Sequence, residues 1–190
     1  MARFRRKTVI DHLCTERGIF SAIREASISS ISRFLQDRPL RRYLVSLFTI
    51  AFGINFVWEM AQMPLYQNMP VNDPYSWWLC FRASLGDGVI ILAIWAIGAV
   101  LLRRVHWYEL RRPASVAILL LSGAVIAVGI ELHALATDRW AYTELMPLLP
   151  IVDVGVSPFI QLLLLPWISM VLAGRKSGVN RSELKRSDDS

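Results

Sequence analysis

The sequence predicts an all-α, polytopic membrane protein with four transmembrane helices and an amphipathic N-terminal cytoplasmic helix. First, 54% of the 190 residues are hydrophobic and the mean hydropathy is +0.41, which is too apolar for an ordinary soluble domain. Second, four apolar segments are each long enough to cross a hydrocarbon core of about 30 Å at about 1.5 Å per residue. Third, runs such as "VIILAIWAIGAVLL" lack the charged outer face that a soluble bundle requires.

Residues 1–42 form a basic leader. About 40 mostly polar or basic residues precede the first apolar run, so no cleavable signal peptide is expected. Within the leader, apolar side chains fall on one helical arc until Pro39: Ile23, Ile28, Ile31, Phe34 and Leu35. This pattern predicts an amphipathic helix on the cytoplasmic leaflet. A flexible leader and a partner-docking helix are equally compatible with it.

The four spans are predicted at residues 43–63, 78–102, 113–136 and 148–174, and residues 175–190 are predicted to be a disordered cytoplasmic tail. The fourth span is interrupted by Pro150, Gly155 and Pro158. Ser157 before Pro158 fits an N-cap followed by proline at the first helical position. We therefore expect the regular helix to begin near Pro158. Residues 147–157 would then be irregular backbone lining a wet cavity.

Basic residues predict the orientation of the spans. All but two of the 21 Lys and Arg lie in the leader, in "RRVHWYELRR" or after Gly174, and the exceptions are Arg82 and Arg139. The positive-inside rule then places both termini in the cytoplasm of a multi-pass protein of the cell inner membrane. Because topology accounts for the net charge of +6, nucleic-acid binding is not expected.

Each span brings one carboxyl group to the outer half of the bilayer: Glu59, Asp87, Glu131 and Asp153. The inner halves contain no charged residue. A charge at mid-membrane costs at least about 2.5 kcal/mol, so four acids at one depth favour a shared polar chamber. The structural alternative is that each acid is protonated, or paired with Arg82, and joins helices by hydrogen bonds.

The candidate site follows from these depths and from helical spacing. The candidate catalytic residues are Glu59, Asp87 and Glu131. The candidate ligand-binding residues are Asn55, Gln62, Arg82, Trp140, Tyr142, Asp153 and Gln161. Asn55, Glu59 and Gln62 stand at i, i+4 and i+7 and share one stripe. Glu131 and His133 lie about 200° apart around a helix, so they are not joint metal ligands. No metal site is expected, and the sequence assigns no cofactor.

The order of the motifs "NFVWEMAQMPLY", "GD", Glu131, "RWAYTELMP" and "GVSPFIQ" resembles an uncharacterised group of small bacterial four-helix integral membrane proteins. The resemblance covers about residues 50–170. It implies a membrane location and no particular reaction. It also implies that the motif residues form one site: Asn55, Trp58, Glu59, Gly86, Asp87, Glu131, Trp140, Tyr142, Met146, Pro147, Pro158 and Gln161.

Three classes of function remain. The first is an enzyme that acts on a membrane lipid or isoprenoid through acid–base chemistry. The second is a non-catalytic subunit of a membrane complex that binds a lipid, a pigment or a partner. The third is a proton-coupled carrier, which the apolar inner halves disfavour. A membrane lipid is the expected partner, and a homo- or hetero-oligomer is compatible with the sequence.

Overall fold

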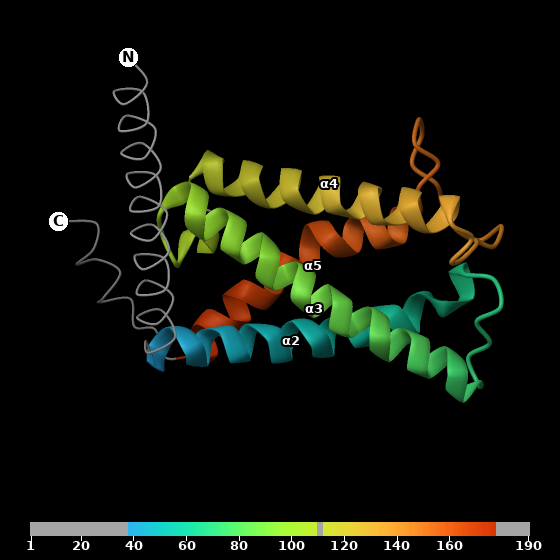
Figure 1. Ribbon diagram of the computed structural model, residues 1–190, viewed down its shortest axis with the longest axis horizontal. Coiled ribbons are helices and arrows are strands. Elements are labelled where there is room, and N and C mark those ends of the chain that lie inside the picture. Colours follow the sequence, from blue (N-terminus) through green and yellow to red (C-terminus); the bar gives the residue numbers. More distant parts are fainter. Residues whose placement is uncertain (1–37, 110–111, 178–190) are drawn as a thin grey trace, which may run out of the picture. The chain divides into compact units, whose positions relative to one another are not determined.

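The computed structural model describes residues 38–109 and 112–177, and these residues are helical with connecting loops (Figure 1). The long helices are α2 (Arg38–Gln62), α3 (Pro74–Leu102), α4 (Pro113–Ala136) and α5 (Val156–Lys176). Two short 3-10 helices, η1 (Met63–Leu65) and η2 (Trp107–Glu109), follow α2 and precede α4. All four long helices are long and apolar enough to cross a membrane. The all-α, multi-pass prediction is confirmed. The predicted leader helix lies outside the described residues.

Helix α2 begins earlier than the predicted span, at Arg38 instead of residue 43. The helix already includes Arg38 and Pro39. Proline is tolerated in the first turn of a helix because its missing N–H has no partner there. Pro39 therefore lies at the start of α2.

Helix α3 also begins earlier than predicted, at Pro74 instead of residue 78. Its N-cap is Asp73, whose carboxylate accepts hydrogen bonds from Tyr75 N (3.3 Å) and Ser76 N (3.2 Å). These bonds satisfy N–H groups that no helical carbonyl reaches. In the sequence, the pair Asp73-Pro74 indicates this helix start. Helix α4 has the predicted bounds.

Helix α5 begins eight residues after the start of the predicted fourth span, 148–174, and ends two residues beyond it. Residues 147–155 are irregular, as predicted, and α5 begins at Val156 with Gly155 as its N-cap. The prediction that Ser157 caps this helix is wrong, because Ser157 lies inside the first turn and its hydroxyl bonds to another helix. Helix α5 continues through Lys176, so the predicted disordered tail is also wrong at its first two residues.

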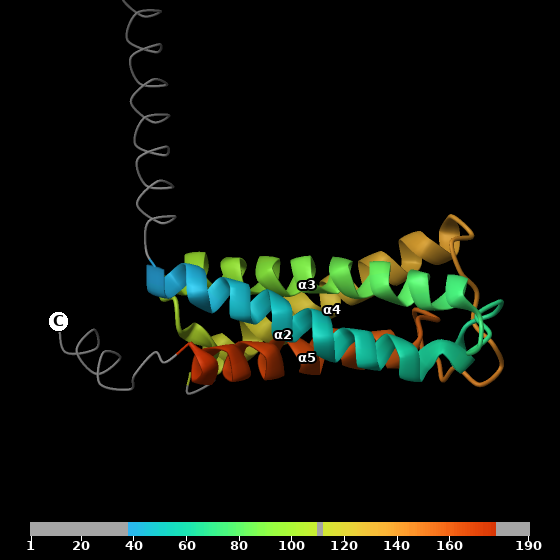
Figure 2. The same cartoon turned by 90° about the horizontal axis from the view of Figure 1, so that it is seen from below.

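Residues 147–155 fold into a small hairpin. Leu149 N donates to Val154 O (2.8 Å) and Val156 N donates to Pro147 O (2.8 Å). In Figure 1 this orange segment stands out from the bundle roughly at right angles to the long helices, and Figure 2 shows the same helices from below. Its tip, Ile151, is fully exposed.

Helices α4 and α5 approach each other closely at Gly123. A Cβ atom there would overlap the carbonyl oxygen of Leu162. Pro166, four residues later in α5, has no N–H to donate to that carbonyl. The Cα of Gly123 thus lies against the Leu162 carbonyl oxygen, which has no hydrogen-bond donor from its own helix at position 166. A weak Cα–H···O contact to this oxygen is therefore favourable.

Aromatic side chains fill the end of the bundle that is predicted to face the cytoplasm. The ring of Tyr43 stacks on that of Tyr108 with a centroid distance of 5.6 Å. The indole nitrogens bond to backbone, Trp107 Nε1 to Trp95 O (2.9 Å) and Trp95 Nε1 to Val105 O (3.1 Å). We call Tyr43, Trp95, Trp107 and Tyr108 the aromatic end.

Two glycines make room for the aromatic end. A Cβ atom at Gly98 of α3 would overlap the indole of Trp107, and one at Gly174 of α5 would press on the hydroxyl of Tyr108. The short helix η2 therefore packs against α3 and α5 only because these two positions lack a side chain.

Candidate functional site

One buried amide joins three helices at the other end of the bundle. Gln161, in the second turn of α5, is 2% exposed. Its Nε2 lies 2.9 Å from Asn55 Oδ1, 2.9 Å from Glu59 Oε1 and 3.0 Å from Asp87 Oδ2. Two of these partners are on α2 and the third is on α3. The predicted convergence of Asn55, Glu59, Asp87 and Gln161 is therefore present in the structure.

Gln62 extends this network by one turn of α2. Its Nε2 donates to Glu59 Oε1 (2.9 Å) and to Gln161 Oε1 (3.3 Å). The side-chain oxygen Oε1 of Gln62 accepts a hydrogen bond from Ser157 Oγ (2.8 Å). Because Ser157 precedes Gln161 by four residues, the two lie on one face of α5. We call Asn55, Glu59, Gln62, Asp87, Ser157 and Gln161 the Gln161 cluster.

Hydrogen counting indicates a carboxyl proton in this cluster. The amide nitrogen of Gln161 has two hydrogens but faces three acceptors. The carboxyl groups of Glu59 and Asp87 also hydrogen-bond to each other. Two carboxylates have no hydrogen to share, so one of the pair carries a proton. The pair thus contains one acid and one base.

Glu131 belongs to a second polar group, on α4. It is 4% exposed, and its Oε2 accepts bonds from Trp140 Nε1 (3.2 Å) and from the Tyr142 hydroxyl. That hydroxyl accepts a bond from Gly155 N (3.0 Å) at the start of α5. Tyr142 therefore ties α4 to α5 through the loop that joins them, while His133 is exposed.

Tyr66 connects the two groups. It pairs with Tyr142 in an isolated β-bridge, and its ring lies 5.7 Å from that of Tyr142 and 6.3 Å from that of Trp140. Burial raises the pKa of the Tyr66 hydroxyl well above its ordinary value, and the charges of Glu131 and Glu59 raise it further. The hydroxyl therefore lies within electrostatic range of both polar groups. Burial and the hydrogen bond to Glu131 likewise raise the pKa of Tyr142.

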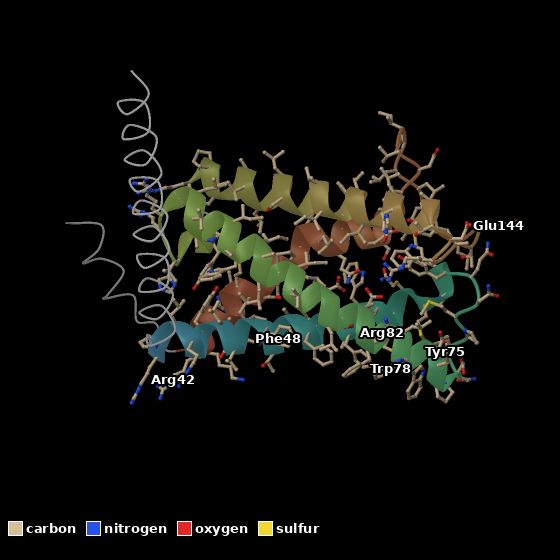
Figure 3. All side chains as sticks on the ribbon, viewed as in Figure 1. Arg42, Phe48, Tyr75, Trp78, Arg82 and Glu144 are labelled. Atoms are coloured by element: carbon tan, nitrogen blue, oxygen red, sulfur yellow. The ribbon has the colours of Figure 1, made fainter. Side chains whose placement is uncertain are left out.

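Two predicted site residues are not brought to these groups. Arg82 is exposed on α3, and within the described part of the chain its guanidinium forms no ion pair. Asp153 is exposed in the hairpin, where its backbone is left-handed with φ 51°. Figure 3 labels Arg82 and shows nitrogen and oxygen atoms gathered between the helices toward the end that carries Tyr75 and Glu144. Three of the four predicted acids thus belong to the two polar groups.

Sequence reasoning did not assign Tyr66 and Ser157 to the site. Ser157 had a signal, because it stands one helical turn before Gln161. Tyr66 had no comparable signal, since its position depends on the pairing of two loops. Gln67 N bonds to Ala141 O (2.9 Å) and Thr143 N bonds to Leu65 O (2.9 Å).

No protein-family model, curated protein or solved structure matches this chain. Across residues 38–109 and 112–177, no three His, Cys, Asp or Glu side chains are grouped as they would be to hold a metal ion. The chemistry of the site therefore follows from its hydrogen bonds. They provide a proton donor beside a proton acceptor, and both groups are carried by helices that are long and apolar enough to cross a membrane.

Proposed function

We propose that this protein is an integral membrane enzyme that moves protons on a membrane lipid or isoprenoid, with Glu59 and Asp87 as its acid–base pair. One observation carries the proposal: the Gln161 amide nitrogen contacts both carboxyl groups, 2.9 Å from Glu59 Oε1 and 3.0 Å from Asp87 Oδ2. A protonated carboxyl beside an ionised one can give and take a proton at neighbouring atoms of a substrate. Gln161 holds the pair in place.

The reaction that fits best is a shift of a carbon–carbon double bond. The protonated carboxyl adds its proton to one alkene carbon, and the π electrons form the new C–H bond. The carboxylate removes a proton from a carbon on the other side of the cation, and the electrons of that C–H bond form the new double bond. Atoms and electrons balance without oxidant or reductant. In this scheme Glu131, held by Trp140 and Tyr142, stabilises the positive charge that develops.

The surroundings of the pair support an apolar substrate. Glu59 and Asp87 are half-buried, whereas Asn55 and Gln161 are buried. The helices that carry the pair are apolar enough to cross a membrane, so in this proposal the exposed part of the pair faces lipid. A substrate dissolved in the bilayer can approach from that side.

A second candidate is a non-catalytic subunit that binds a lipid, pigment or partner. One observation favours it: the side-chain amides of Asn55, Gln62 and Gln161 all have protein partners already. A network satisfied within the chain is also what helix-joining polar residues require. The proton-coupled carrier is third, because the aromatic end packs buried rings across the opposite end of the bundle.

Deuterium transfer separates these candidates. Membrane vesicles containing the protein are incubated in heavy water with a defined isoprenoid such as farnesol, and the recovered isoprenoid is analysed by mass spectrometry. We expect the wild-type protein to introduce solvent deuterium at carbon. Glu59→Gln and Asp87→Asn each keep shape but remove a titrating carboxyl, and each should reduce that incorporation at least about a hundredfold.

Asp153→Asn is the matched control, because it removes an acid predicted at the same depth that lies outside the cluster. It should incorporate deuterium like the wild type. If wild-type vesicles incorporate no more deuterium than vesicles without the protein, across isoprenoids of several lengths, the enzyme proposal fails. A binding subunit would give that result.

We also propose that the protein lies in a bacterial inner membrane with both termini in the cytoplasm, in keeping with the distribution of basic residues and the motif resemblance. In a variant without Cys14 and Cys80, cysteines at Asn68 and Glu144 should react with an impermeant maleimide on intact cells. A cysteine at Val105 should react only after permeabilisation. Labelling of position 105 in intact cells would overturn the orientation.

A further inference from the structure

The indole nitrogen of Trp58 is buried without a hydrogen-bond partner among the described residues. Two other side-chain atoms share this property, the Tyr43 hydroxyl and Ser169 Oγ. Both differ from Trp58 in kind. A serine hydroxyl can rotate toward a carbonyl of its own helix, and the Tyr43 ring stacks on Tyr108 at the aromatic end. An indole N–H has one fixed direction and can only donate.

Trp58 lies on the face of α2 that carries the Gln161 cluster. It follows Asn55 by three residues and precedes Gln62 by four, and residues at these spacings are neighbours on a helix. It also directly precedes Glu59. Asn55 and Gln62 bond across to α5, but Trp58 does not join their network. Next to the acid–base pair, the chain thus presents one buried donor that it does not use.

A buried donor without an acceptor is costly, and such groups in folded proteins usually have a partner. The missing partner of an indole N–H is an acceptor atom, which in lipids and isoprenoids is oxygen. No charge is required of it, because the indole is neutral. A hydroxyl, carbonyl or ester oxygen of a bound molecule meets these conditions, and a pure hydrocarbon does not.

We propose that Trp58 Nε1 donates a hydrogen bond to an oxygen of the substrate, so that the substrate is an oxygen-bearing isoprenoid or lipid. This inference rests on the proposed function and narrows its substrate class. Trp58 and Glu59 are adjacent in α2, about 100° apart around the helix, so a molecule that reaches both presents its oxygen to the indole and its double bond to the carboxyl. An allylic alcohol or an enone has this arrangement.

The test uses two probes that differ mainly in the oxygen, farnesol and β-farnesene. The protein contains seven Trp residues, so a ¹⁵N-labelled sample in detergent gives seven indole N–H signals, and Trp58→Phe identifies the one from Trp58. We expect farnesol to move that signal downfield in a saturable way, and β-farnesene to leave it in place. Trp58→Phe should weaken farnesol binding about tenfold. Trp78→Phe, which removes an exposed indole from α3, should not weaken it.

Equal shifts with both probes, or no shift with either, would overturn the inference. So would a Trp58 proton that exchanges rapidly with water and is indifferent to farnesol, since its partner would then be water. These results come from the wild-type protein and do not depend on whether the variant folds. A farnesol-specific shift without deuterium transfer would retain the oxygen site and reject the enzyme proposal. Deuterium transfer without that shift would reject the oxygen site and retain the enzyme proposal.

Discussion

The two ends of the bundle are closed by different physical means. At the aromatic end, rings pack in front of glycines, and Trp107 lies where a side chain of Gly98 would otherwise lie. At the other end, Gln161 joins α5 to α2 and α3 through its amide nitrogen. The first closure depends on shape. The second depends on hydrogens being supplied to acceptors and on one carboxyl proton.

This difference predicts how each end fails. A shape-dependent contact fails when volume is added, because close-packed rings cannot move aside without strain. A network of polar groups fails when a donor is removed, because the remaining acceptors are buried without a partner. Substitutions that add one methyl group and substitutions that remove one amide therefore test the two ends separately.

The largest effect is expected at the aromatic end. Gly98→Ala places a methyl group against the Trp107 indole and should lower the free energy of unfolding by about 3 kcal/mol. Titration with SDS of the protein in mild-detergent micelles measures this change. Gly129→Ala on α4 is the matched control, because nothing lies within 4 Å of its added Cβ. It should be neutral or stabilise by up to about 1 kcal/mol. Equal effects of the two variants would contradict the shape argument.

The next effect is expected in the Gln161 cluster. Gln161→Leu keeps the approximate volume but leaves Glu59, Asp87 and Asn55 without their common donor. We expect a loss of about 2 kcal/mol in the same titration. Gln67→Leu changes an exposed amide and should cost no more than about 0.5 kcal/mol. A Gln161→Leu protein as stable as the Gln67→Leu protein would show that the network is not needed to join the helices.

A smaller effect measures the coupling of the acid–base pair. If Glu59 and Asp87 share a proton, Glu59→Gln and Asp87→Asn should be non-additive by about 1 kcal/mol. The control cycle combines Glu59→Gln with Asp153→Asn, which lies outside the cluster, and should be additive within about 0.5 kcal/mol. Additivity in both cycles would mean that the two carboxyls act independently.

The smallest effect is a pH dependence in the alkaline range. The folded-state pKa values of Tyr66 and Tyr142 lie above their ordinary value of about 10, so the unfolded chain releases these protons first. Their contribution to stability is complete below about pH 10 and is lost as pH rises through their folded-state pKa values. Tyr66→Phe and Tyr142→Phe should each make the alkaline loss of stability shallower, as monitored by unfolding at a series of pH values. An unchanged slope in both variants would mean that neither hydroxyl is as shielded as the structure indicates.

The sequence by itself determined where the four long apolar helices lie in the chain and which polar residues share one face of α2. Hydropathy and length are local properties, so they found all four helices and both ends of α4. Helical periodicity alone placed Asn55, Glu59 and Gln62 together. The helix starts at Arg38 and Pro74 were missed because polar or aromatic first turns do not raise hydropathy.

Only the tertiary structure decided which acids meet. Helices α3 and α4 are apolar on nearly every side, so no stripe in their sequences shows how each is rotated about its axis. That rotation brings Asp87 to Gln161 and leaves Arg82 exposed. Asp153 was placed with the other acids by its depth alone, but it lies in a hairpin whose left-handed backbone and loop pairing carry it away from them. Depth in a membrane follows from counting residues along a helix, whereas contact between helices depends on packing that no single segment encodes.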